Sequence, residues 1–162
     1  MANYVALLRG IMPMNPKMKG EKLRKVFESL GFEHVETVIA SGNVVFSSRS
    51  TDTAALEARI EKALPKQLGF KSTTIIRSCE ELERLVKKNP FKGVRDEKPN
   101  YLIVTFFKDR RKELCTVVDL TGARTPDFMR TLEKTHGKEM TTRTWKTLGR
   151  ILKKMGSSLN LM

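Results

Sequence analysis

The sequence predicts an α+β protein in which one supersecondary unit is used twice. The segment RSCEEL from Arg77 is matched by RTWKTL from Arg143, and RLVKK from Arg84 by RILKK from Arg150, at a constant offset of 66. The first half also alternates between strand-like and helix-like apolar patterns. A repeat at fixed spacing indicates duplication of a structural unit.

The first half of the chain is expected to contain four strands and three helices. Apolar runs predict the strands, apolar residues at i, i+3, i+4 and i+7 predict the helices, and Gly31 and Gly69 end the first two. Ser78 and Glu81 form a capping box for the third helix. The expected order is strand 3 to 9, helix from 20, strands 34 to 39 and 44 to 47, helix from 53, strand 71 to 77 and helix 79 to 89.

The order strand, helix, strand, strand, helix, strand is that of the split β-α-β, or ferredoxin-like, unit. The second half repeats it with fewer elements: strands 100 to 107 and 114 to 118, a helix opened by Pro126, and a last helix from about Thr144. We therefore expect tandem ferredoxin-like subdomains with the second copy abbreviated. Residues 1 to 90 form the first with an added helix, and residues 91 to 162 form the second.

The chain is strongly basic, which bears on its partners. Its net charge is +13, and residues 91 to 162 carry 16 basic against 8 acidic side chains. Such a surplus favours contact with nucleic acid or another anionic ligand, although it is also typical of a soluble basic surface. The sequence has neither a secretory signal nor an apolar run that would span a bilayer, so we expect a cytoplasmic protein without membrane contact.

Three blocks of sequence in order resemble a known bacterial family. LLRGI at residues 7 to 11, SGNVVF at 41 to 46 and TTRTWKT at 141 to 147 are similar to motifs of domain of unknown function 1697. The resemblance implies a duplicated ferredoxin-like fold, and the family's biochemical role is unassigned. The sequence departs from the commoner pattern after Ile11, where MPMNP replaces an Asn and a Gly-rich turn.

Arg9 and Asn43 are the first pair of candidate ligand-binding residues. Arg9 ends the first strand and Asn43 begins the third, and these strands are central neighbours in the expected topology. Directed donors at adjoining strand ends can bind a phosphate or carboxylate. In the structural alternative, Arg9 pairs with a glutamate and Asn43 shapes its turn.

A second group of candidates surrounds the start of the last helix. Thr142 and Arg143 precede that helix, whose first turn favours anions, and Lys146 and Arg150 follow on it. Residues 143 to 154 hold five basic side chains and no acidic one. The alternative is that the threonines are ordinary caps, Trp145 is core and the charges form a solvated face.

The sequence identifies no catalytic, metal or cofactor site. His34 and His136 lack the neighbours that would hold a metal, and Cys79 and Cys115 are expected to be reduced core thiols. Three functions stay open: binding of nucleic acid or another anionic partner through the basic last helix, an enzyme that orients a small phosphorylated or carboxylate substrate with Arg9, Asn43 and Arg143, and a scaffold or oligomerisation module that uses open strand edges.

Overall fold

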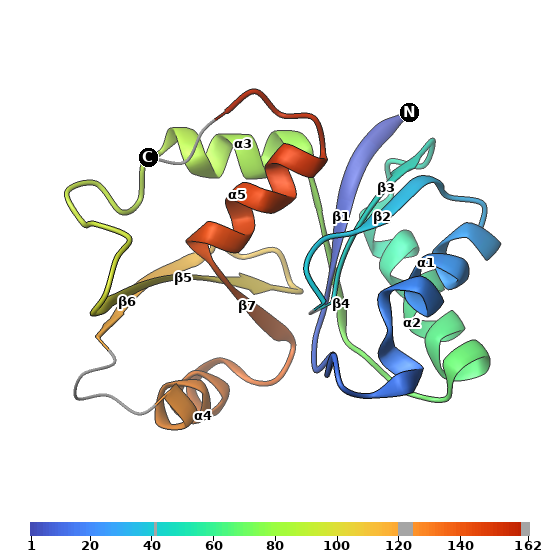
Figure 1. Cartoon of the computed structure of the whole chain (residues 1–162), viewed down its shortest axis with the longest axis horizontal. Helices are drawn as coiled ribbons and strands as arrows, with labels where there is room; N and C mark the ends of the chain where they lie inside the picture. The colour runs from blue at the N-terminus through green and yellow to red at the C-terminus, as the bar shows by residue number, and fades with distance from the viewer. Residues whose placement is uncertain (41, 120–124, 160–162) are drawn as a thin grey trace.

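Two antiparallel sheets and five α-helices make up the protein in the computed structural model, which describes residues 1 to 40, 42 to 119 and 125 to 159 (Figure 1). No helix among these residues has the length and apolar character needed to cross a membrane. The α+β class predicted from the sequence is confirmed.

The first sheet has four strands in the order β2-β3-β1-β4. The strands are β1 (Ala2–Leu8), β2 (Glu33–Thr37), β3 (Asn43–Ser48) and β4 (Thr74–Ser78). Strand β1 lies at the centre, antiparallel to both β3 and β4. Its side chains alternate, because Tyr4, Ala6 and Leu8 belong to one apolar cluster and Val5 and Leu7 to another.

Helices α1 (Gly20–Ser29) and α2 (Thr53–Leu68) cover one face of this sheet (Figure 1). A short 3-10 turn, Pro16–Met18, precedes α1 in the methionine-containing loop. Asp52 caps α2 by accepting from the Ala55 N–H, and Gly69 ends it with φ of 79°, a value that favours glycine. Pro65 is accommodated inside the last turns of α2.

The second sheet has three strands in the order β6-β5-β7. They are β5 (Asn100–Phe107), β6 (Leu114–Asp119) and β7 (Met140–Thr144), and β5 is central. Helix α4 (Thr125–His136) lies on one side of this sheet and α5 (Trp145–Lys154) on the other (Figure 1). Residues 108 to 113, all described, contain no helix or strand, so β5 leads directly to β6.

Helices α3 (Cys79–Lys87) and α5 lie between the two sheets (Figure 1). Their apolar faces share one central core with both sheets. This core takes Val5, Leu7, Val45 and Ile75 from the first sheet, Leu82 and Leu85 from α3, Leu102, Val104 and Phe106 from β5, and Trp145, Leu148, Ile151 and Leu152 from α5. Residues on both sides of position 90 are therefore buried against each other.

The offset of 66 seen in the sequence joins equivalent elements of the structure. Added to β4, Thr74–Ser78, it gives Met140–Thr144, which is β7, and the helices that follow are α3 and α5. Ser78 caps α3 and Thr144 caps α5, each through its hydroxyl. Strand β7 corrects the sequence prediction, in which residues 140 to 144 belonged to no strand.

Candidate functional site

The six candidate residues fall into two places. Arg9, Asn43, Thr142 and Arg143 meet at the junction between the two sheets. Lys146 and Arg150 lie elsewhere, on the exposed face of α5, where they line a separate cavity. Arg143 and the basic residues of the last helix, grouped together in the sequence prediction, therefore belong to two different surfaces.

Arg143 extends from β7 to the strand ends of the first sheet. Its Nε donates to Asn43 Oδ1 at 2.6 Å, and its Nη2 donates to the carbonyl oxygens of Leu8 at 2.9 Å and Gly42 at 3.3 Å. Its Nη1 donates to Thr141 Oγ1 at 2.6 Å and to the Thr142 carbonyl at 2.8 Å. These bonds occupy the five N–H groups of the guanidinium, so the side chain binds one sheet to the other.

No described acidic residue balances the charge of Arg143. Within the described residues it makes no ion pair, and its acceptors are neutral amide, hydroxyl and carbonyl oxygens. Burial lowers the pKa of the Arg143 guanidinium to about 10, because the charged form is disfavoured away from water. The group still carries its charge near pH 7, so the junction holds a net positive potential.

Arg9 lies beside Arg143 and pairs with α4, as the structural alternative predicted. Its Nη2 bonds with Glu133 Oε1, and its Nη1 donates to the Lys138 carbonyl at 2.5 Å and the Met140 carbonyl at 3.2 Å. A cavity of about 330 Å³ opens next to it. The lining residues are Leu8, Arg9, Gly10, Ile11, Met129, Met140, Thr141, Thr142 and Arg143.

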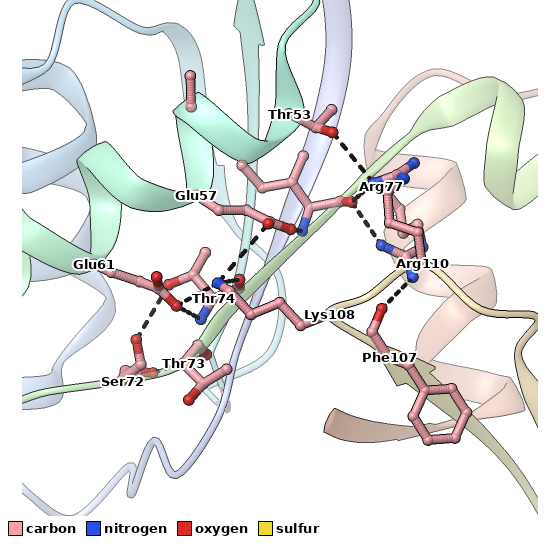
Figure 2. A network of polar contacts seen from close by, with 12 residues as sticks. Thr53, Glu57, Glu61, Ser72, Thr73, Thr74, Arg77, Phe107, Lys108 and Arg110 are labelled. Carbon is pink, nitrogen blue, oxygen red and sulfur yellow. Dashed lines mark hydrogen bonds and ion pairs between the residues drawn. The ribbon is translucent and has the colours of Figure 1, made fainter. Parts of the chain in front are cut away.

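A second polar cluster repeats this arrangement around Arg77 (Figure 2). Arg77 is only 2% exposed, and its Nη1 donates to the Ile76 carbonyl at 3.0 Å and its Nη2 to the Phe107 carbonyl at 2.9 Å. Lys108 donates to Glu61 Oε2 at 2.6 Å and to the Thr74 carbonyl at 3.0 Å. Lys108 follows β5 as Arg9 follows β1, so the two clusters use equivalent positions.

The two clusters differ in charge. Two further cations, Lys108 and Arg110, lie around Arg77. The three cations form ion pairs with four carboxylates, those of Glu57, Glu61, Glu81 and Glu113. Around Arg143, one ion pair is found among the described residues, between Arg9 and Glu133. Arg77 Nε lies 3.8 Å from the charged Glu113 Oε1, whereas the equivalent Nε of Arg143 donates to the neutral Asn43 Oδ1. The Arg77 cluster is compensated and the Arg143 cluster keeps an excess of positive charge.

The ionisable groups of the Arg77 cluster respond to burial and to each other. Burial is the main cause that raises the pKa of Glu57, and the Ile76 N–H and Lys108 oppose it only in part. Burial also pushes the pKa of Glu81 upward, but the Ser78 N–H and Arg110 outweigh it, so this pKa is lowered. Burial lowers the pKa of Arg77, and the nearby Arg110 adds to the effect.

The cations of α5 lie on a different, concave surface. Lys146, Arg150 and Lys153 are spaced to share one helix face, and they line a groove of about 700 Å³. All three side chains are exposed, and none makes an ion pair with a described residue. Below, we call this cavity the α5 groove; its other lining residues are Phe91, Val94, Arg95, Asp96, Glu97, Leu102, Trp145 and Gly149.

The opposite wall of the α5 groove was not predicted from the sequence. No element was predicted between residues 90 and 99, yet Val94, Arg95, Asp96 and Glu97 line the cavity together with α5. No local pattern marks these residues, because their position depends on how the connection packs against α5. Lys153 could have been predicted as a member of this site, since it continues the basic helix face of Lys146 and Arg150.

The remaining candidate groups do not add a reactive centre among the described residues. Cys79 and Cys115 are half-buried free thiols, and burial is the main cause that raises the pKa of each. Thiols with raised pKa values are weak nucleophiles near neutral pH. Within the described ranges, no three His, Cys, Asp or Glu side chains are grouped to hold a metal ion.

Comparison with known proteins identifies relatives at the level of family and fold. A solved structure of the conserved bacterial protein SP0830 from Streptococcus pneumoniae is similar, with a TM-score of 0.69 and 20% sequence identity over 95% of this chain and 98% of that one. A search of curated proteins returned no match. The model of the family described as "Protein of unknown function (DUF1697)" matches residues 1–130. The chain belongs to this family, as the three sequence blocks predicted.

Proposed function

We propose that the protein binds a phosphate-bearing anion in the α5 groove, with nucleic acid as the partner that its charge favours. One observation carries the proposal: Lys146, Arg150 and Lys153 converge on one cavity and have no described acidic partner. Cations left without protein partners are free to contact phosphate oxygens. The net charge of +13 raises the concentration of polyanions near this surface.

Contact with nucleic acid in this groove would be made to the phosphate backbone. Trp145 is 6% exposed and Phe91 is 7% exposed, so their rings are part of the core and offer little area for bases to stack. Stacking proteins need exposed aromatic faces. We infer that affinity comes mainly from charge and therefore decreases as salt concentration increases.

Salt-dependent binding of a fluorescent single-stranded oligonucleotide tests the proposal. In a variant with Lys146→Gln, Arg150→Gln and Lys153→Gln, affinity at low salt should fall, and the slope of log K against log salt should decrease by about 2. The control variant Lys22→Gln, Arg24→Gln and Lys25→Gln removes the same charge from α1, on the other side of the molecule. Absence of binding at low salt, or equal losses in both variants, would contradict the proposal.

A small anionic ligand at the Arg143 cluster is the second candidate function, and it covers an enzyme that acts on a phosphorylated or carboxylate substrate. The observation in its favour is the cavity of about 330 Å³ beside a buried and uncompensated arginine. Because the Arg143 donors already bond within the protein, Arg9 and Thr142 would supply the direct contacts. Titration with inorganic phosphate, followed by NMR at Thr142 and Gly10, tests this candidate.

We propose two ferredoxin-like subdomains, at residues 1 to 90 and 91 to 162, as the framework of these sites. The order β2-β3-β1-β4 with α1 and α2 on one face supports the first unit. The order β6-β5-β7 supports a second unit that lacks one helix and one strand. A cytoplasmic location and oligomerisation through open strand edges remain proposals, which fractionation and concentration-dependent sedimentation test.

A further inference from the structure

We propose that the α5 groove selects a nucleotide whose base carries an amino group, with the phosphate on α5 and the amino group on Asp96. This inference rests on the proposed function and names its ligand class more narrowly. It comes from the distribution of charge inside the groove, where α5 contributes three cations and the opposite wall contributes two carboxylates and one cation, Arg95. A ligand with a phosphate at one end and hydrogen-bond donors at the other matches both walls.

Asp96 is the residue on the wall opposite α5 whose carboxylate can still accept hydrogen bonds from a ligand. It is half-buried, it lines the groove, and it makes no ion pair or hydrogen bond with another described residue. Its neighbour Glu97 differs, because Glu97 Oε1 lies 3.5 Å from Arg95 Nη1. An ionised carboxylate accepts hydrogen bonds and donates none. Asp96 would therefore recognise an amino group and not a carbonyl oxygen.

The floor between the two walls is apolar. Phe91 and Trp145 pack edge to face, with ring centroids 5.1 Å apart and an interplanar angle of 72°, and Leu102 is buried beneath the groove. Val94 remains 36% exposed at the rim. Because little of either ring is exposed, a nucleobase here would be positioned by the hydrogen bond of its amino group to Asp96 and by contact with the rim at Val94, and not by stacking. The volume of about 700 Å³ lies within the range of roughly 300 to 1,000 Å³ that is typical of small-molecule sites.

Gly149 adds an observation from the helix itself. It occupies the middle of α5, lines the groove and lies on the same face as Lys146 and Lys153. Glycine inside a helix costs about 0.5 to 1 kcal/mol relative to alanine. The missing side chain lets a ligand approach the helix backbone between the cations, which is a use for an otherwise unfavourable residue.

Calorimetric titration with AMP, CMP and UMP tests the inference. AMP and CMP carry an exocyclic amino group, whereas the N3–H of UMP lies between two carbonyl oxygens that the Asp96 carboxylate repels, so we expect the first two to bind about tenfold tighter, as for one charge-assisted hydrogen bond. Asp96→Ala should make the three affinities equal. Glu97→Ala is the matched control in the same loop and should keep the preference.

The outcomes separate this inference from the proposed function. Equal affinities for all three nucleotides, or a preference that survives Asp96→Ala, would overturn the inference and leave phosphate binding in place. Binding of the oligonucleotide without binding of any mononucleotide would also overturn the inference alone. If the oligonucleotide and the mononucleotides all fail to bind at low salt, both proposals are wrong.

Discussion

Arg77 and Arg143 occupy equivalent positions and reach across the molecule in opposite directions. Arg77 donates to the carbonyl of Phe107, the last residue of β5, and Arg143 donates to the carbonyl of Leu8, the last residue of β1. Each also donates to the carbonyl of the residue that precedes it. Lys108 and Arg9 form a second reciprocal pair. Lys108 donates to the carbonyl of Thr74, the first residue of β4, and Arg9 donates to the carbonyl of Met140, the first residue of β7.

This relationship predicts different penalties for the same substitution. Arg77→Met leaves Glu113 without its cation and should destabilise the protein by about 3 to 5 kcal/mol at pH 7. Arg143→Met leaves neutral acceptors without donors and should cost about 1 to 3 kcal/mol. Urea unfolding followed by circular dichroism measures both values.

The pH dependence of these two penalties provides an internal control. Arg77 favours the ionised form of Glu57, whose pKa burial raises in the folded protein, so the penalty of Arg77→Met should shrink as Glu57 is protonated between pH 7 and pH 4. The Arg143→Met penalty should stay constant, because no described carboxylate pairs with Arg143. Equal and pH-independent losses would refute the difference between the clusters.

Glu81 should stabilise the fold at neutral pH and not in acid. Its carboxylate accepts from the Ser78 N–H and pairs with Arg110, and its pKa is lowered in the folded protein. A lowered pKa gives stability that is present above the usual value and is lost as the pH falls through the folded one. Glu81→Gln should therefore cost about 1 to 2 kcal/mol at pH 7 and much less near pH 3, whereas the exposed control Glu80→Gln should change little at either pH.

Thr105 offers a stabilising substitution. Its side chain is fully buried in β5, and its hydroxyl has no hydrogen-bond partner among the described residues. A buried hydroxyl without a partner costs about 1 to 3 kcal/mol. Thr105→Val keeps the shape and the β-branching, so we expect the thermal midpoint to rise. A lower midpoint would indicate that the hydroxyl has a bonding role.

Gly149→Ala should increase stability and reduce ligand binding at the same time. Alanine favours the helix interior by about 0.5 to 1 kcal/mol, and its methyl group would project from the lining of the α5 groove. Thermal unfolding and nucleotide titration on the same sample measure both effects. Gly156→Ala is not a suitable comparison, because Gly156 has φ of 84°; a replacement at the exposed Lys153 position, Lys153→Ala, separates loss of charge from loss of space.

The strands and helices of the first half could be predicted because their signals are local. Leu23, Val26 and Phe27 repeat at helical spacing and are buried together, and the capping box of Ser78 and Glu81 is present. Strand β7 was missed since MTTRT has no apolar alternation. The offset of 66 could have predicted strand β7, because adding it to the residue numbers of β4 gives those of β7.

The candidate sites were less accessible to sequence reasoning. Asn43 lies opposite Leu7 in the sheet, as expected from neighbouring central strands, but its bond to Arg143 spans 100 residues of sequence. That contact exists only because α3 and α5 bring the two sheets together. Likewise, Asp96 and the cations of α5 line the same groove because of tertiary packing, which composition and spacing do not encode.

The exchange between Arg77 and Arg143 has the form of an isologous subunit interface, in which one residue of each partner contacts the same feature of the other. Here both partners belong to a single polypeptide. Covalent linkage frees them from the identity that symmetry imposes on separate subunits, so one copy can acquire acids while its counterpart keeps an amide. Specialisation of a single side of the molecule thus becomes possible without loss of the contact that holds the halves together.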